Sequence, residues 1–414
     1  MDRDIDQTDV WSDGEFPQSG YDYYIGNNSI SFWPANSDHP NRVDTFPGDR
    51  LITADLVLIY LYTSTTIPEL HAYGRTAIYP RASTSLSGKL SLHFRTDSTR
   101  AYARMFGSIE FWINSEIDGD GSLLAESYYP YTGNGSTLYL SGMNTNWVGC
   151  LSTAWTKQAA SNPDPSETAH TRIAVGDGRN LGGALSAFRH DSLKLDKYSE
   201  LRVTNTTTFA ETTRGFLILT NGILNVDGGQ TASLSAPITL QGTMLKTGGG
   251  TLALGGPIRF GLNNDLEDAT APEEGYNVID VRSGALKVTN AKAIDGAALT
   301  FAADASLHLD LHPAEAAMQS KGFAFANASS ALACTGKIPV VFEGGNADEY
   351  NSGVVAPLCT VASGSAATTM AKLNPRMAVA SGTRAGVLSS VDNGDGTSTI
   401  LATFKPKGLT LIYR

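Results

Sequence analysis

The sequence predicts an all-β protein: a right-handed parallel β-helix, or solenoid, followed by a small mixed α/β region that caps its C-terminal end. Three observations predict it. Short segments of alternating apolar and polar residues recur along most of the chain, and glycine, asparagine and aspartate separate them. Residues 242–256 join two such segments through a glycine corner. Short strands linked by tight corners are typical of coils that stack, because no single coil can bury a core alone.

The composition is that of a β-rich exported protein and argues against several other classes. Only 17% of the 414 residues are charged, whereas 41% are hydrophobic and 42 are glycine, which argues against intrinsic disorder. The net charge is −11 without any basic run, so we expect no nucleic-acid partner, since phosphate binding needs clustered positive charge. No apolar stretch approaches the ~18 residues of a transmembrane helix.

Residues 1–42 are predicted to be a lead-in to the solenoid. The first six residues are acidic and lack the basic and apolar regions of a signal peptide. Because the predicted architecture is one found on exported proteins, we expect an export signal outside this chain and an extracellular or cell-surface location.

Residues 43–311 are predicted to form the parallel β-helix. Alternation over a few residues places one side chain inside and the next outside, and coils of ~20–25 residues would stack. Longer and more aromatic segments leave a β-sandwich as the alternative for residues 43–155. The clearest predicted strands are 53–62, 89–94, 108–113, 136–140, 201–203, 216–219, 223–226, 238–240, 243–246, 251–254, 278–281, 285–288, 298–301 and 307–309.

The sequence pattern changes after residue 311, and residues 312–414 are predicted to be a capping region. A cap would cover the apolar end of the solenoid and prevent its edge from pairing with another molecule. The predicted helices are 314–320 and 365–372, and the predicted strands are 338–342, 354–361, 386–391 and 397–404, the last two joined as a hairpin by an Asp-Asn-Gly-Asp-Gly turn.

The block at 242–256 resembles the passenger-associated repeat of bacterial autotransporters. That repeat reads Gly-x-Leu-x-Lys-x-Gly-x-Gly-Thr-Leu-x-Leu-x-Gly, followed later by Gly-x-Leu-x-Val. Here Met244 takes the first leucine position, Lys246 the lysine position, and residues 284–288 supply the later part, so the best match spans 242–288. The resemblance implies a β-helical passenger without the membrane barrel that completes an autotransporter. It also implies a structural or adhesin-like function in a secreted or cell-surface bacterial protein, with extracellular glycans or a host or matrix surface as partners.

A carbohydrate-active protein is the alternative, because β-helices also carry polysaccharide lyases and glycoside hydrolases. Hydrolases of this kind need two carboxylates across the scissile bond. The chain has no Asp-Asp pair, Gly-His-Gly, Arg-Ile-Lys or Gly-x-Ser-x-Gly, and the triglycine at 248–250 does not precede a helix as a phosphate loop would. We therefore predict no catalytic residues and no cofactor, and the sequence does not indicate an oligomeric state.

Two clusters remain as candidate binding residues. Glu116, Asp118 and Asp120 alternate around glycines, and such carboxylates can hold calcium; an Asp-Gly corner is the other interpretation, which the composition favours. Tyr128, Tyr129 and Tyr131 lie in a loop rich in proline and glycine, and exposed aromatic rings can stack on sugars.

The remaining histidines and cysteines give weaker indications. His308 and His312 are four apart, but alternation and a following proline indicate a strand rather than a metal-binding helix. Cys334 and Cys359 could pair in an oxidising compartment, although small buried thiols are the other interpretation for both.

Overall fold

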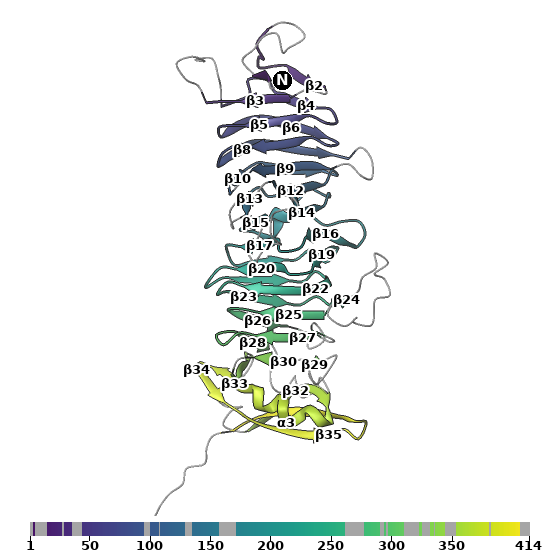
Figure 1. The fold of residues 1–414 in the computed structure, drawn as a ribbon, viewed down its shortest axis with the longest axis vertical. Helices are drawn as coiled ribbons and strands as arrows, with labels where there is room; N and C mark the ends of the chain where they lie inside the picture. The colour runs from purple at the N-terminus through teal and green to yellow at the C-terminus, as the bar shows by residue number, and fades with distance from the viewer. Residues whose placement is uncertain are drawn as a thin grey trace, which may run out of the picture. The chain divides into compact units, whose positions relative to one another are not determined.

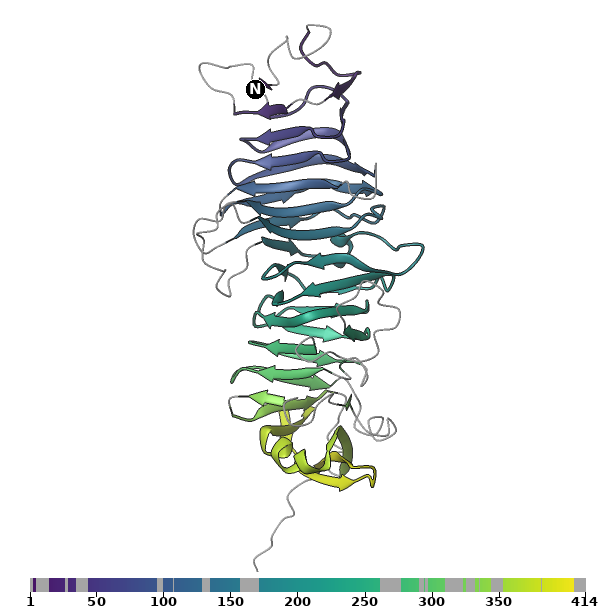
Figure 2. The same ribbon diagram turned by 45° about the vertical axis from the view of Figure 1, so that its right-hand side comes forward.

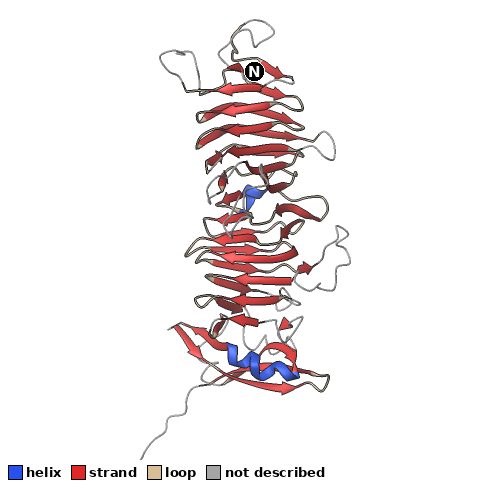
Figure 3. Ribbon diagram, viewed as in Figure 1, coloured by secondary structure: helices blue, strands red, loops and turns tan. Residues whose placement is uncertain are grey.

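The computed structural model contains two compact units, residues 1–225 and residues 226–414. Strands dominate each of them (Figure 3), and most of the strands pair in parallel, as in β-solenoids. The predicted boundaries of the β-helix, after residue 42 and after residue 311, remain predictions. The structure describes residues 3–4, 15–26, 29–34, 44–94, 100–106, 108–128, 135–156, 171–260, 277–289, 294, 297–309, 323–324, 332–334, 336–343, 353–380 and 382–405.

In the first unit, each coil contributes strand segments to parallel stacks (Figure 1). Because all of these strands pair in parallel, the β-sandwich alternative for residues 43–155 is wrong, since sandwich sheets are antiparallel. One stack contains β4 (Arg50–Thr53), β6 (Thr65–Tyr73), β8 (Thr84–His93) and β11 (Glu116–Gly119); the next contains β5 (Leu58–Leu61), β7 (Ala77–Pro80), β9 (Ala101–Phe106), β12 (Leu123–Tyr128) and β14 (Leu151–Thr156).

A further stack carries the candidate site of this unit. It begins on the N-terminal halves of β6 and β8 and continues through β10 (Glu110–Ile113), β13 (Ser136–Leu140), β15 (Thr171–Val175) and β17 (Glu200–Val203). The coils differ in length: Thr65 is paired with Leu86, whereas Leu140 is paired with Val175. The coil spacing is therefore less regular than the sequence predicts.

Columns of apolar side chains fill the interior because the register aligns inward positions from coil to coil. Leu51, Leu70, Leu90 and Ile117 are register partners on successive coils, and each is at most 1% exposed. Alternation sends the residues between them outward. Such a column buries apolar surface continuously, which is the main stabilising contribution in a stacked-coil fold.

The second unit confirms the strand–corner–strand prediction for residues 242–256. β22 (Ile238–Thr247) and β23 (Thr251–Leu254) flank the glycine corner (Figure 2), and Gly248 there has φ +74°. Later coils add β25 (Asn277–Val281), β26 (Ala285–Val288), β27 (Ala298–Phe301) and β28 (Ser306–Leu309) in parallel. Their inward column is Leu254, Val288, Leu309, Phe342 and Met377.

The last part of the second unit combines parallel and antiparallel pairing. The helix predicted at 365–372 is present as α3 (Ala366–Lys372), and the predicted hairpin is present as β35 (Val387–Asp392) and β36 (Thr397–Phe404). β36 also pairs antiparallel with β32 (Val354–Ala362). The helix predicted at 314–320 and His312 lie outside the described residues. Across the described ranges, no helix is long and apolar enough to cross a membrane.

Candidate functional site

A groove of about 450 Å³ lies on the outer surface of the first unit, beside β13 and β15. Side chains from the ends of successive parallel strands line it, so the stacking of coils places them together. The residues that line it include Trp112, Tyr139, Gly176 and Asn205. The groove therefore combines aromatic surface with groups that form hydrogen bonds.

Trp112 and Tyr139 form the aromatic wall. They are register partners on β10 and β13, and their rings stack with centroids 5.0 Å apart and planes 10° from parallel. The Tyr139 hydroxyl donates a hydrogen bond of 3.0 Å to Glu110. Burial and this bond raise the pKa of Tyr139, so the phenol remains a neutral donor at ordinary pH.

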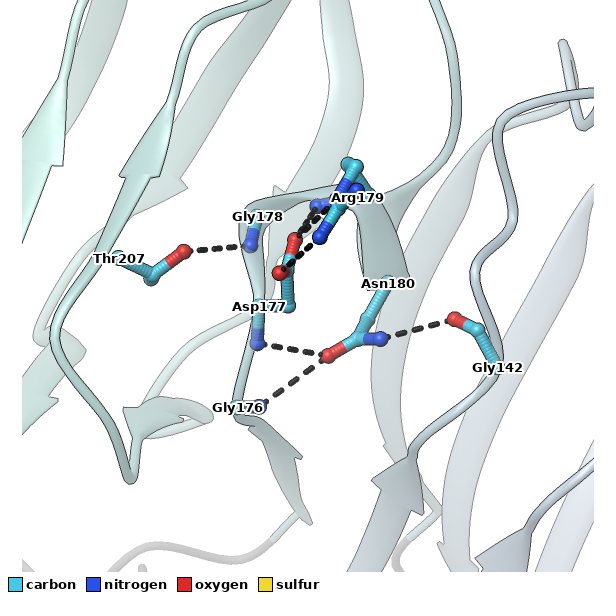
Figure 4. A network of polar contacts seen from close by, with 7 residues as sticks. All are labelled: Gly142, Gly176, Asp177, Gly178, Arg179, Asn180 and Thr207. Atoms are coloured by element: carbon cyan, nitrogen blue, oxygen red, sulfur yellow. Dashed lines mark hydrogen bonds and ion pairs between the residues drawn. The ribbon is translucent and has the colours of Figure 1, made fainter.

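A rigid corner closes the groove where β15 ends (Figure 4). The Asn180 carboxamide accepts hydrogen bonds from the backbone N–H groups of Gly176 and Asp177 and donates to the Gly142 carbonyl oxygen at 2.8 Å. Asp177 holds the Arg179 guanidinium in a bidentate pair with distances of 2.9 and 2.7 Å. This pair lowers the pKa of Asp177, and the corner is thereby fixed without a ligand.

A second polar cluster lies outside β6, β8 and β11. The Nδ1 atom of His71 is 2.8 Å from Nε2 of His93, and the two rings stack within 4° of parallel. Tyr73 also stacks on His93, with centroids 4.3 Å apart. One imidazole must donate and the other accept, so this pair holds a single shared proton between its facing nitrogens.

The histidine pair makes the stability of the first unit sensitive to acid. Burial, and then the neighbouring His71, lower the pKa of His93 below 6.5, against smaller opposing effects of Asp120 and Asp118. The unfolded chain then binds more protons than the folded chain below pH 6.5. The contribution of His93 to the free energy of unfolding should therefore be complete above that pH and decrease as the pH falls from 7 to 5.

Replacing His93 with glutamine should flatten this dependence, measured by urea unfolding across the same pH range. The other charged groups that face the pair are Glu69 and Lys89, and neither changes in the variant. His190→Gln, at a partly exposed histidine outside the pair, is the control and should keep the wild-type slope. An unchanged slope in His93→Gln would contradict the assignment.

Arg214 is a buried cation of the first unit and is only 5% exposed. It begins β19 (Arg214–Leu219). Its guanidinium donates to the carbonyl oxygens of Gly183 at 2.5 Å, Trp147 at 2.6 Å and Gly149 at 3.0 Å. Burial lowers its pKa to about 10, which still leaves it charged at neutral pH.

Lys246 is the corresponding buried cation of the second unit and belongs to the repeat-like block. Its ammonium group donates to the carbonyl oxygens of Gly248 and Gly250 at 2.7 Å and of Ser283 at 2.9 Å. A Cβ added to Gly284 would lie 2.7 Å from this ammonium group. The lysine and the glycines of the block therefore form one corner, in which the cation adds a donor to those of the backbone.

The predicted calcium residues do not converge on a common point. Asp118 pairs with Lys89 at 2.8 Å, Asp120 accepts the backbone N–H of Phe94, and Glu116 accepts from Asn146. No group of three or more His, Cys, Asp or Glu side chains could hold a metal ion within the ranges that the structure describes.

Only one of the three tyrosines in the predicted binding loop lies within the described residues. Tyr128 ends β12, while Tyr129 and Tyr131 lie outside the described residues. Trp112 and Tyr139, the two aromatic residues that do line a groove, could not be recognised as a pair from the sequence. Its members are far apart in sequence, and only knowledge of the coil length would have aligned them.

The remaining candidates have structural partners. His308 is 2.7 Å from Glu343, and this bond and Lys287 lower the pKa of Glu343 to about 2, against the opposing effect of burial. The thiols of Cys334 and Cys359 are free, so the structure has no disulfide between them. Burial raises the pKa of Cys359.

No family model, no curated protein and no solved structure matches this chain.

Proposed function

We propose that the protein is a non-catalytic, structural or adhesin-like segment of a secreted or cell-surface bacterial protein, built as a right-handed parallel β-helix. The observation that supports it most is the outer ladder of the first unit. Asp22, Arg50, Glu69, Lys89 and Glu116 are successive register partners with alternating charge. Ladders of this kind add polar pairing between coils to the apolar columns inside.

The pairing of acidic groups also supports a non-catalytic function. Glu126 and Glu200 are both buried, and each is held by an arginine, Arg104 and Arg172 respectively. A general acid needs a raised pKa and a second carboxylate opposite it. Each of these carboxylates is instead part of an ion pair with a guanidinium, which suits a scaffold.

The last part of the second unit is proposed to be the cap of the solenoid. Antiparallel β32, β35 and β36 and the helix α3 interrupt the parallel stacking there. A change from parallel to antiparallel pairing ends the series of equivalent edges onto which another coil could add.

The test is incubation with a panel of plant, bacterial and animal polysaccharides, measuring new reducing ends and unsaturated products. We expect neither to exceed the level of a heat-denatured sample. Release of either product would contradict the scaffold proposal and favour a carbohydrate-active enzyme. Detection of the protein only in the cytoplasm of its source bacterium would contradict the proposed location.

A further inference from the structure

We infer that the protein forms a two-fold symmetric dimer in which β35 of one copy pairs antiparallel with β35 of a second copy. The inference concerns association of the chain and is independent of the proposed function. β35 belongs to the hairpin drawn in yellow in Figure 1. Its open edge, its composition and the direction of its backbone groups each point to a second copy.

The open edge is the first argument. β35 is the last strand of its sheet, and among the residues that the structure describes it pairs only with β36. The helix α3 contacts β36 as well as β35, so it lies over a face of the hairpin and leaves the outer edge of β35 open. Five of the six residues of β35 are exposed, including Val387 at 66% and Val391 at 51%. Such an edge offers N–H and C=O groups to another strand.

The composition of β35 is the second argument. Natural sheet edges are usually protected by lysine, proline, a bulge or a very short strand. β35 reads Val-Leu-Ser-Ser-Val-Asp, and its register with β36 runs through all six residues without a shift. The edge strand of the neighbouring sheet, β34 (Gly382–Ala385), is shorter and carries Arg384. β35 therefore lacks the protection that its neighbour has.

Hydrogen bonds at the two ends of β35 show which of its backbone groups face outward. The N–H of Asn393 donates to Thr397 of β36 at 2.9 Å, so Asn393 faces β36. The N–H of Gly386 donates at 2.9 Å to Pro375 of β33 (Leu373–Val379), so Gly386 faces away from β36. Neighbouring residues of a strand face opposite edges. The outward residues are therefore Leu388, Ser390 and Asp392.

These outward groups match a copy of the same strand in one register. A two-fold axis perpendicular to a sheet passes between one residue and its own copy, because opposed side chains must lie on the same face. With the axis at Ser390, this residue opposes its copy, and Leu388 opposes Asp392 of the second copy at both ends. All three opposed pairs face each other through their outward groups, and each exchanges two hydrogen bonds.

The neighbouring registers are less favourable. With the axis at Val391, only two opposed pairs exchange hydrogen bonds before the hairpin turn begins. With the axis at Ser389, Asp392 of the second copy would lie opposite Gly386. Pro375 already occupies that place.

The side chains are compatible with the register centred on Ser390. On the outer face, Val391 opposes Ser389 of the second copy in a non-hydrogen-bonded pair, where side chains approach most closely. Asp392 is the only charged residue of β35, and its carboxylate accepts the N–H of Gly394 at 2.9 Å. The two copies of Asp392 lie at opposite ends of the paired segment, so the carboxylates do not face each other.

The interface closes after two copies because the same strand contributes to both sides of it. Stacking of solenoid ends would be open-ended, whereas this pairing leaves no equivalent edge for a third copy. The paired segment buries less surface than the ~1,200–2,000 Å² of stable interfaces. We therefore expect a weak dimer, with a Kd on the order of 10–100 μM.

The experiment is sedimentation velocity of the full chain at concentrations up to about 500 μM, well above the expected Kd. We expect an equilibrium between monomer and dimer without larger species. Ser390→Pro removes an outward N–H but none that bonds to β36, and should raise the Kd at least about tenfold. Ser390→Ala keeps that N–H and is the matched control, which should dimerise as the wild type does.

Cysteine pairs test the register independently. Ser389→Cys combined with Val391→Cys places thiols of the two copies opposite each other with Cα atoms ~4.5 Å apart, which suits a disulfide. Oxidation should therefore give a covalent dimer. Either substitution alone leaves the two introduced thiols diagonal to each other, ~7–8 Å apart, and should not cross-link. The wild type, with free Cys150, Cys334 and Cys359, gives the background.

Three outcomes would overturn the inference: the wild type stays monomeric at every concentration, Ser390→Pro dimerises as tightly as Ser390→Ala, or a single cysteine variant cross-links as readily as the double variant. If Ser390→Pro does not fold, the cysteine variants decide the question. Each of these outcomes leaves the scaffold proposal intact. Conversely, release of products in the polysaccharide panel would overturn the scaffold proposal and leave the dimer unaffected.

Discussion

Replacing Arg214 with methionine is expected to lower the free energy of unfolding of the first unit by about 3 kcal/mol. The variant removes the guanidinium donor from the carbonyl oxygens of Gly183 and Gly149 in a buried site, whereas that of Trp147 keeps the backbone N–H of Gly183 at 3.1 Å. A buried acceptor without a partner costs ~1–3 kcal/mol, and removing the buried charge offsets part of that sum. Urea unfolding followed by tryptophan fluorescence measures the change.

Arg189→Met is the matched control for this substitution. Arg189 is the register partner of Arg214 on the preceding coil, but its side chain is 50% exposed and pairs with Asp191. An exposed ion pair contributes ~0–1 kcal/mol, so the control should lose less than a third as much as Arg214→Met. Equal losses from the two variants would show that burial of the guanidinium is not the cause.

The sequence carried enough information to predict the local structure of the solenoid. Alternation and glycine corners are local signals, so β23 and the hairpin of β35 and β36 are found where the pattern predicts them. Parallel pairing follows from repetition of the same unit. Coil length does not, because a coil can lengthen at its corners without any change in the strands, as between Leu140 and Val175.

The candidate groove could not be predicted from the sequence for the same reason. The partners in a ladder of outward side chains can be identified only when the register is known, because one unrecognised insertion shifts every later partner. Trp112 and Tyr139 are both strand aromatics, which in isolation indicate strand propensity. Their significance comes from the register, which pairs them on successive coils and stacks their rings with centroids 5.0 Å apart.

The two buried cations illustrate a related limit. Lys246 contacts Gly248 and Gly250 in its own corner, which the repeat-like pattern places beside it, whereas Arg214 contacts Trp147 and Gly149 from much earlier coils. Both cations are held by hydrogen bonds to backbone carbonyl oxygens. In a chain with few charged residues, a cation that donates to several carbonyl oxygens can stabilise a corner in addition to the backbone N–H groups there.

Replacing Lys246 with methionine should lower the free energy of unfolding of the second unit by about 2 kcal/mol at pH 7, measured by guanidinium unfolding. The carbonyl oxygens of Gly248 and Ser283 lose the ammonium donor, whereas that of Gly250 keeps the backbone N–H of Ala285 at 3.1 Å. The loss is smaller than for Arg214 because relief of the buried charge offsets more of it. Lys337→Met, at an exposed lysine of the same unit, should change stability by less than about 0.5 kcal/mol. A comparable loss in Lys337→Met would contradict the role of the corner.

The pH dependence of the same variant gives an independent signature. Burial lowers the pKa of Lys246 from 10.5 to about 8, so between these values the unfolded chain binds more protons than the folded one. The free energy of unfolding of the wild type should therefore gain about 3 kcal/mol from this group as the pH rises through that window. Lys246→Met lacks the group and should lack that gain, while other lysines and tyrosines titrate equally in both proteins. Parallel pH profiles for the two proteins would show that the ammonium group is not buried in the folded corner.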